Sequence, residues 1–287
     1  MIFVPVLLFY LLFMYKPMYG VIIAFKDFNY RLGIMGSPWA GLDYFEEMLK
    51  LNDFWQALKN TLYIAMGRIV YEFPLPIILA LIINEVRNLR AKKFFQIVYT
   101  FPHFLSWVII SGIALNMFGD SGVVNSFLQI IGAEKVSVLT QPSSFRSFIF
   151  GASIWKEMGW GTIIFLAAIA GISPSLYEAA KVDGANRWHC IWYITLPSIL
   201  PTIMILLILK IGQVMNLGGF DQIINTYNAG VYEVADILDT FIYRRTFVQG
   251  ASFSSSAAVG LFKSVINCIL LVSANAASKK MGQEGIM

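Results

Sequence analysis

The residues that could carry covalent or metal chemistry are few, and they lie on different segments of the chain. The sequence has two histidines, His103 and His189, and two cysteines, Cys190 and Cys268. It contains no Cys/His spacing typical of a metal site, no HExxH, no nucleophile elbow and no GxxxxGK[ST] phosphate loop. We therefore expect no catalytic residue, no metal site and no nucleotide cofactor in this chain.

The composition indicates a protein that crosses a membrane several times. Hydrophobic residues make up 57% of the 287 residues and charged residues 13%, about half the charged share of an average soluble domain. The net charge of +4 is too small to indicate a nucleic-acid partner. No basic stretch and small-residue cleavage site open the chain, so we expect a retained first span rather than a signal peptide, preceded by a short cytoplasmic leader.

Six apolar segments are each long enough, at about 20 residues, to cross a bilayer as a helix. They lie near 2–25, 61–84, 97–118, 147–171, 196–217 and 257–276. The sequence therefore predicts an all-α membrane protein with a single domain over 1–287. A Lys16-Pro17 step inside the first segment predicts a kink there.

The distribution of Lys and Arg between these segments predicts their orientation. The connections 85–96, 172–195 and 277–287 hold eight basic residues among 47, whereas 27–60, 119–146 and 218–256 hold seven among 101. Because basic residues are enriched in cytoplasmic loops, the first set should be cytoplasmic, which puts both termini inside. Among the outer segments, we expect an amphipathic helix over 42–51, a loop over 218–227 and an amphipathic helix on the membrane surface over 231–245.

Charged and polar side chains within the predicted spans should face protein or water rather than lipid. The candidates for a translocation path are Arg68, Glu72, Lys156, Glu157, Lys210, Gln213, Asn216, Lys263 and Asn267. Arg68 and Glu72, four residues apart, share a helix face and could form either an internal salt bridge or part of the path. Lys156 and Glu157 point about 100° apart and are not expected to pair.

Two further spans carry polar stripes. Lys210, Gln213 and Asn216 follow one another in steps of three, and Ser256, Gly260, Lys263 and Asn267 lie on one helix face. Such stripes indicate either a shared water-accessible lining or helix interfaces held by polar groups. His103, near the start of the third span, is expected to be a hydrogen-bonded interfacial residue.

The longest polar interruption between spans is the segment 173–201. Ser173 can cap a helix, Pro174 fits its first position and Gly184 fits the residue just past its end. Asn186 can cap a second short helix, which we expect Pro197 to close. The segment therefore predicts a helix-turn-helix elbow outside the bilayer, with small residues that let another protein's backbone come close.

The elbow resembles the EAA loop of ABC importer membrane subunits. The pattern is Glu178-Ala179-Ala180, three residues, Gly184, nine residues, Ile194, one residue and Leu196-Pro197. The resemblance implies the type I ABC importer permease fold and a cytoplasmic coupling loop over 172–195 that docks on an ATPase. It assigns that contact to the residues at the elbow tip, namely Glu178, Ala179, Ala180, Asp183, Gly184 and Ala185.

Two other stretches, FKDFNYRLGIMGSPWAGLDYF (25–45) and GLFKSV (260–265), are similar to carbohydrate-uptake permeases, in the branch associated with complex oligosaccharides. The resemblance implies a multi-pass permease of the bacterial inner membrane that imports oligosaccharides by alternating access. It implies a second related permease, two ATPase subunits that hold ATP and Mg²⁺, and an extracellular binding protein. The alternatives are a peptide or amino-acid permease of another ABC importer and a membrane-embedded transferase.

The charges within the spans also predict something about the sugar. Lys16, Lys156, Lys210 and Lys263 outnumber Glu157 once Arg68 and Glu72 are taken to cancel. If these lysines line the cavity, they favour an acidic oligosaccharide; the alternative is that they bond the partner permease or loop carbonyls. The sequence alone does not choose between the two.

Overall fold

The computed structural model describes residues 3–280, which form α-helices and, within that range, no β-strand beyond an isolated bridge between Lys26 and Trp39. Five helical stretches are long and apolar enough to cross a membrane, and α10 (Pro142–Ala170) with α11 (Pro174–Val182), bent by 69°, makes a sixth. The five are Phe3–Phe25, Asn52–Asn84, Trp107–Ile130, Arg187–Ile211 and Phe253–Lys280. The all-α membrane fold is thereby confirmed.

The chain divides into two compact units, and each is described by itself. Within the described residues, the first unit comprises 3–59 and 237–266, and the second comprises 60–236 and 267–280. The boundaries fall inside two continuous helices, α5 (Asn52–Gly67) and α17 (Phe253–Lys280).

The first unit begins with a helix that exposes nearly its whole surface. α1 (Phe3–Tyr10) continues through a π-turn at Leu11–Tyr15 into α2 (Lys16–Met18) and a 3₁₀ turn at Tyr19–Phe25. The change of helix type falls at Lys16-Pro17, because the proline ring and its missing N–H interrupt regular α-turns. No residue between Phe3 and Ile23 is buried.

The rest of this unit consists of short helices and a core of aromatic side chains around Phe54. α3 (Gly33–Gly36) precedes α4 (Asp43–Lys50), which confirms the helix predicted over 42–51. The buried Phe54 ring on α5 makes edge contacts with Phe241 on α16 (Leu238–Tyr243) and with Phe262 on α17. Ala57, Ile237 and Val259 are also buried in this unit.

The single surface helix predicted over 231–245 was wrong. The segment forms α15 (Tyr232–Ala235), an extended break at Asp236 and Ile237, then α16 and a π-turn at Arg244–Val248. The Thr240 hydroxyl satisfies the free Ile237 N–H at 2.9 Å, which stabilises the new helix start. Ala235, Ile237, Leu238 and Phe241 are buried, so these helices are part of the protein interior rather than a surface cover.

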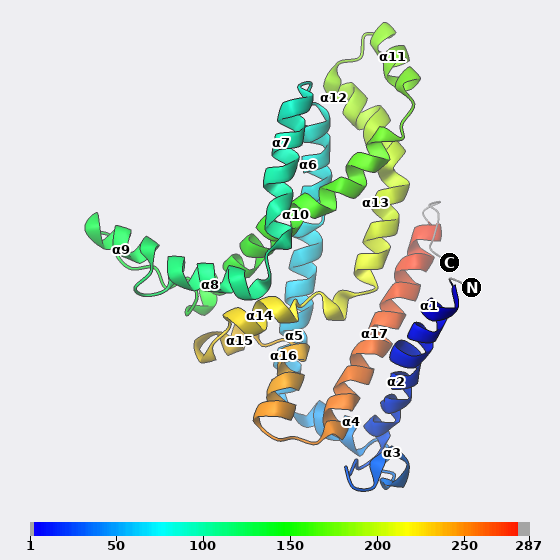
Figure 1. The fold of residues 1–287 in the computed structure, drawn as a ribbon, viewed down its shortest axis with the longest axis vertical. Helices are drawn as coiled ribbons and strands as arrows, with labels where there is room; N and C mark the ends of the chain where they lie inside the picture. The colour runs from blue at the N-terminus through cyan, green and yellow to red at the C-terminus, as the bar shows by residue number, and fades with distance from the viewer. Residues whose placement is uncertain (1–2, 281–287) are drawn as a thin grey trace. The chain divides into compact units, whose positions relative to one another are not determined.

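In the second unit, α10 is the helix against which the others pack. The second half of α5 runs through a π-turn at Arg68–Glu72 into α6 (Pro74–Asn84), and α7 (Leu89–Thr100) follows after a short turn. α10 contacts α6, α7 and α13 (Leu196–Ile211) (Figure 1). A Cβ at Gly159 would overlap the Tyr99 carbonyl, so this glycine allows α10 and α7 to approach closely.

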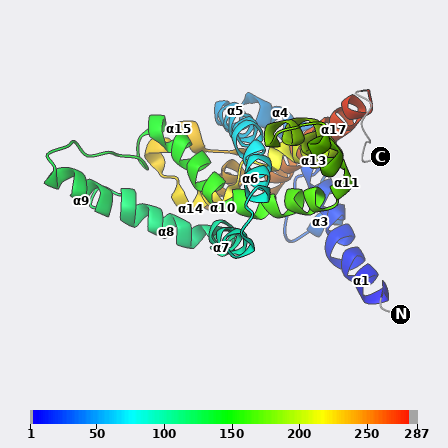
Figure 2. The same cartoon turned by 90° about the horizontal axis from the view of Figure 1, so that it is seen from above.

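The continuous third span predicted over 97–118 was wrong. α7 ends at Thr100, a 3₁₀ turn occupies Phe101–Phe104, and α8 (Trp107–Phe118) starts afresh. Pro102 in the turn has no N–H to continue the helix, and the Ser106 hydroxyl accepts a bond from the Ile109 N–H as the cap of α8. α8 and α9 (Val123–Ile130) lead away from α7 (Figure 2).

The elbow has the expected first helix and a different second one. α11 ends at Val182, and Gly184 has the left-handed φ of +80° that its position requires. α12 (Arg187–Cys190) does not end at Pro197; it continues through a π-turn at Ile191–Thr195 into α13. The π-turn widens the helix where a regular α-turn would set the Tyr193 carbonyl against the proline ring.

The segment after α13 also differs from expectation. α13 ends at Ile211, and Gly212, a poor helix former packed against Leu271, caps it. The predicted loop over 218–227 contains α14 (Phe220–Thr226), which begins after Gly219 at a φ of +77°. The glycine allows a backbone conformation from which the helix can start at once.

Candidate functional site: a coupling elbow and intramembrane polar clusters

The elbow presents its tip to the surroundings. Glu178, Ala179, Asp183 and Gly184 are exposed, and Val182 exposes 88% of its surface, although it is a large apolar residue. The side chains of Glu178 and Asp183 make no hydrogen bond or ion pair with another described residue. Such a set of unpaired acids beside an exposed valine and small residues is suited to a protein partner.

The turn at the tip is closed by backbone bonds. Ala185 N donates to Ala180 O at 2.9 Å and Gly184 N to Lys181 O at 3.1 Å, which is the arrangement of a Schellman motif. Asn186 Oδ1 accepts the His189 N–H at 2.9 Å, as predicted for a cap, whereas the Ser173 side chain makes no capping bond.

The elbow is held firmly to the start of α13. The Tyr177 hydroxyl meets the Thr195 hydroxyl at 3.0 Å, which links α11 to the π-turn. A hollow of about 350 Å³ lies between the two legs, lined by Ala180, Asp183, Gly184, Ala185, His189, Tyr193 and Ile194. All the residues assigned to the elbow tip are thus brought together except Glu178 and Ala179, which lie on α11 outside the hollow.

Arg68 and Glu72 form a buried pair, as one of the two alternatives predicted. Arg68 Nε lies 3.6 Å from Glu72 Oε1, and the two side chains expose 11% and 8% of their surfaces. Arg68 Nη2 donates to Gln222 Oε1 at 2.5 Å, and Gln222 Nε2 donates to the Ile149 carbonyl at 2.7 Å. These bonds join the π-turn of α5–α6 to α14 and α10, so the pair acts as an internal connection.

Lys156 and Glu157 do pair, contrary to the prediction. Lys156 Nζ lies 3.5 Å from Glu157 Oε1 and donates to the His103 carbonyl at 2.5 Å. Glu157 Oε2 meets His103 Nδ1 at 2.8 Å, and the His103 ring stacks on Trp160 with centroids 4.5 Å apart. The broken helix before α8 draws both flexible side chains to His103, which overrides their angular separation on α10.

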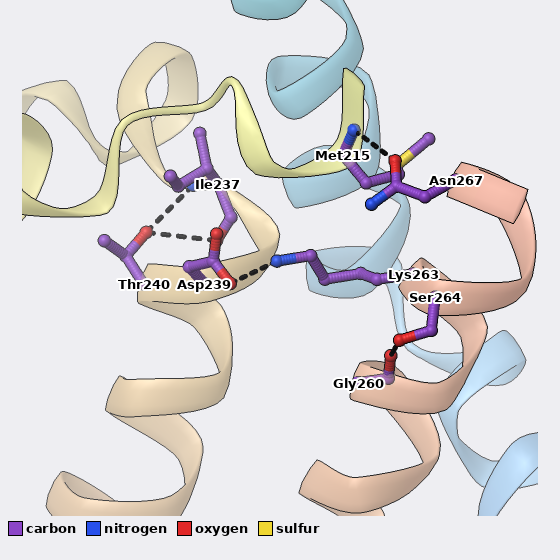
Figure 3. Close-up of polar contacts among 8 residues, drawn as sticks. All are labelled: Met215, Ile237, Asp239, Thr240, Gly260, Lys263, Ser264 and Asn267. Carbon is purple, nitrogen blue, oxygen red and sulfur yellow. Dashed lines mark hydrogen bonds and ion pairs between the residues drawn. The ribbon is translucent and has the colours of Figure 1, made fainter. Parts of the chain in front are cut away.

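The stripe on α17 is used in contacts within the chain. In the first unit, Lys263 Nζ forms an ion pair with Asp239, and in the second unit, Asn267 Oδ1 accepts the Met215 N–H at 2.9 Å (Figure 3). These contacts support the interface alternative for this stripe. Gln213 and Asn216 lie beyond the end of α13 and are exposed, so they do not continue a helical face with Lys210.

Sequence reasoning missed the partners of the buried charges. Gln222 lies in the predicted loop over 218–227 and Asp239 in the predicted surface helix over 231–245, and their spacing gives no signal of the contacts with Arg68 and Lys263. The count of unpaired lysines was therefore too high, because Asp239 offsets Lys263.

Apolar helices that enclose polar clusters, with an exposed and rigid elbow between two of them, define a multi-pass membrane protein of the transport class. Residues 72–283 match the family described as binding-protein-dependent transport system inner membrane component. The chain belongs to this family.

Relatives match nearly the whole chain. It is 47% identical over 284 residues to protein LplB of Bacillus subtilis (strain 168), covering 99% of this chain and 89% of that protein. It is 45% identical over 283 residues to the polygalacturonan/rhamnogalacturonan transport system permease protein YteP of the same organism, covering 98% and 88%. A chain of a bacterial alginate ABC transporter, solved in complex with an alginate pentasaccharide-bound periplasmic protein, superposes with a TM-score of 0.89 at 39% identity, covering 99% and 95%.

Proposed function

We propose that this chain is the permease subunit of an ATP-driven importer that carries oligosaccharides across the bacterial inner membrane by alternating access. Family membership supports the transport role. The names of the permease YteP and of the alginate transporter, both of which handle polysaccharides, support a sugar substrate over peptides or amino acids. They also favour transport over a transferase reaction.

The observation that carries the coupling role is the elbow tip, with exposed acids that have no partner among the described residues. We assign to it the contact with an ATPase subunit, through Glu178, Ala179, Ala180, Asp183, Gly184 and Ala185. Two such ATPases would supply ATP and Mg²⁺, a second related permease would complete the path, and an extracellular binding protein would deliver the sugar.

Within the path, the cluster around His103 is the strongest candidate for substrate contact. His103 and Glu157 expose 28% and 41% of their side chains, and Trp160 offers an exposed aromatic surface on which a sugar ring can stack. Lys156 and Lys210 remain candidates for an attraction to acidic sugars, whereas Arg68 and Glu72 are positioned as internal supports.

Gly184→Trp tests the coupling role. Bulk at Gly184, where a side chain would meet open space, should block the ATPase contact while the spans still insert. We expect the ATPase to stop co-purifying and oligosaccharide-stimulated ATP hydrolysis to fall to the basal rate. Gly132→Trp is the matched control, because Gly132 has a similar φ of +74° and equally open surroundings. Unchanged ATPase assembly in Gly184→Trp would refute the assignment.

The orientation has its own test. In a variant that carries Cys190→Ser and Cys268→Ser, a cysteine at Glu178 should react with an impermeant thiol reagent only after the membrane is opened. A cysteine at Glu134 should react in intact cells. The reverse pattern would invert the topology.

A further inference from the structure

A second polar pocket lies in the second unit, on the face of α10 that meets α5 and the π-turn after it. Its volume is about 730 Å³, and its walls include Tyr63, Tyr71, Ser143, Arg146 and Ser147. Gly151 also faces it, and a Cβ there would meet open space. None of the lining residues is acidic. The pocket thus combines one fixed cation with four hydroxyl groups.

Arg146 is held rigidly and keeps hydrogen-bonding capacity. Its Nε donates to the Val234 carbonyl at 3.1 Å, and its Nη2 donates to Asn60 Oδ1 at 2.8 Å. Asn60 is itself fixed, because its Nδ2 donates to the carbonyls of Glu233 and Asp236, both at 3.0 Å. The Tyr63 ring covers the guanidinium at 4.1 Å.

A guanidinium has five N–H donors in a planar fork. The bonds to Val234 and Asn60 use two of them, on Nε and Nη2, and Nη1 donates to no other described residue, so the Nη1 end of the fork keeps its donors for a ligand. That end matches the two oxygens of a carboxylate. The hydroxyls of Ser143, Ser147, Tyr63 and Tyr71 can bond the hydroxyls of a sugar ring, and Tyr71 with Phe150, 5.8 Å apart, adds an aromatic surface.

The position along α10 places this pocket far from the elbow. From Arg146 to the end of α10 at Ala170 the helix rises by about 36 Å at about 1.5 Å per residue, more than the hydrocarbon thickness of a bilayer of about 30 Å. The elbow follows directly after Ala170. Arg146 therefore lies toward the opposite side of the membrane from the elbow.

We propose that this pocket binds a carboxylate-bearing sugar residue of the transported oligosaccharide, with Arg146 as the specificity-determining residue. This inference rests on the proposed function and adds the site that distinguishes acidic from neutral sugars. Since the elbow is the cytoplasmic end in that function, the pocket is at the side from which the substrate arrives. It is separate from the His103 cluster, none of whose members lines it.

The test compares two probes on the complete transporter in lipid nanodiscs: tetragalacturonate and its fully methyl-esterified, neutral form. Isothermal titration should show that the wild-type transporter binds the acid at least about tenfold more tightly than the ester, since a charge-assisted fork is lost in the ester. Arg146→Gln should bring the ratio close to one, with affinity for the ester changed by less than about twofold. Arg146→Lys should recover only part of the ratio, because an ammonium lacks the fork.

A second variant leaves Arg146 and its anchors untouched. Gly151→Leu fills the pocket and should weaken binding of both probes at least about tenfold, while Gly112→Leu, the same change at another helical glycine with open surroundings, should have no effect. If Arg146→Gln fails to assemble, Gly151→Leu still tests whether the saccharide binds in this pocket, and the wild-type ratio still tests whether the transporter prefers the acid.

Three results would overturn the inference: a wild-type ratio near one, a ratio that survives Arg146→Gln, or unchanged binding in Gly151→Leu. Loss of co-purified phospholipid in these variants without loss of saccharide affinity would assign the pocket to lipid instead. If neither oligosaccharide, presented by its binding protein, stimulates ATP hydrolysis by the wild-type transporter, the proposed function itself fails. If ATP hydrolysis is stimulated normally but the variants bind both saccharides as the wild type does, only the assignment of this pocket is refuted.

Discussion

The elbow and the Arg68 cluster, which consists of Arg68, Glu72 and Gln222, both lie in the second unit and both contain charged side chains, but in opposite surroundings. At the elbow, the side chains of Glu178 and Asp183 are exposed without a partner among the described residues, and backbone bonds close the turn at the tip. Around Arg68, the charges are buried: Arg68 pairs with Glu72 and donates to Gln222, which in turn donates to the backbone carbonyl of Ile149 on α10. The comparison teaches that the surface of the elbow is suited to contact with another molecule, whereas the contacts of the cluster hold segments of this chain together.

The largest expected effect is a difference in the free energy of unfolding between substitutions in the two regions. Arg68→Ala leaves Glu72 buried without its counter-charge and should lower the free energy of unfolding by about 3–5 kcal/mol. Glu178→Ala removes an exposed charge and should change it by less than about 0.5 kcal/mol. Denaturant unfolding of the purified permease followed by tryptophan fluorescence measures both.

The double variant Arg68→Met/Glu72→Met is the control for this prediction. It removes both charges together and should recover a good part of the loss, because no isolated charge remains buried. If the Arg68→Ala protein were as stable as the Glu178→Ala protein, the claim that the Arg68 cluster holds this chain together would be wrong.

A pair of glycines sharpens the comparison. Gly219 and Gly184 have nearly equal positive φ, +77° and +80°, but a Cβ at Gly219 would overlap the Arg68 guanidinium while one at Gly184 meets nothing. Alanine at either position should cost about 1–2 kcal/mol for the left-handed backbone. Gly219→Ala should cost about 1–3 kcal/mol more for the displaced arginine, as the same unfolding assay will measure. Equal losses would mean that Arg68 adjusts freely.

The smallest effect lies within the elbow. Asn186→Ala removes the bond that caps α12 and should destabilise that turn by about 1 kcal/mol, whereas Ser173→Ala removes only an exposed bond to Ser175 and should be close to neutral. Hydrogen exchange of the His189 amide reports the local opening. Equal exchange in both variants would show that the cap is dispensable.

The same contrast explains what could be predicted. The first leg and the tip of the elbow were predictable because Pro174, Gly184 and the Asn186 cap are local signals, and the α4 helix followed from the same kind of pattern. The partner of Arg68 lies 154 residues away and that of Lys263 in a segment taken as a surface helix. No local spacing signals such contacts, because tertiary packing decides them.

Errors in the predicted elements have a related cause. Two prolines act opposite to the prediction: the third span was predicted to run through Pro102, which interrupts it, whereas Pro197 was expected to close a helix that continues through a π-turn into α13. The length of an apolar segment locates a span. It does not predict whether the helix will break at a proline or continue past it through a π-turn.

The π-turn at Ile191–Thr195 also makes the two legs of the elbow mechanically unequal. On one side, Arg187–Ile211 is a single uninterrupted rod of 25 residues, about 37 Å long at about 1.5 Å per residue. On the other, α11 meets α10 at a 69° bend near Gly171. In the proposed coupling role, a displacement applied at the tip would pass along the rod to the far end of α13, whereas the bend near Gly171 would let α10 follow less. The membrane would then receive the motion of the ATPase chiefly along one leg.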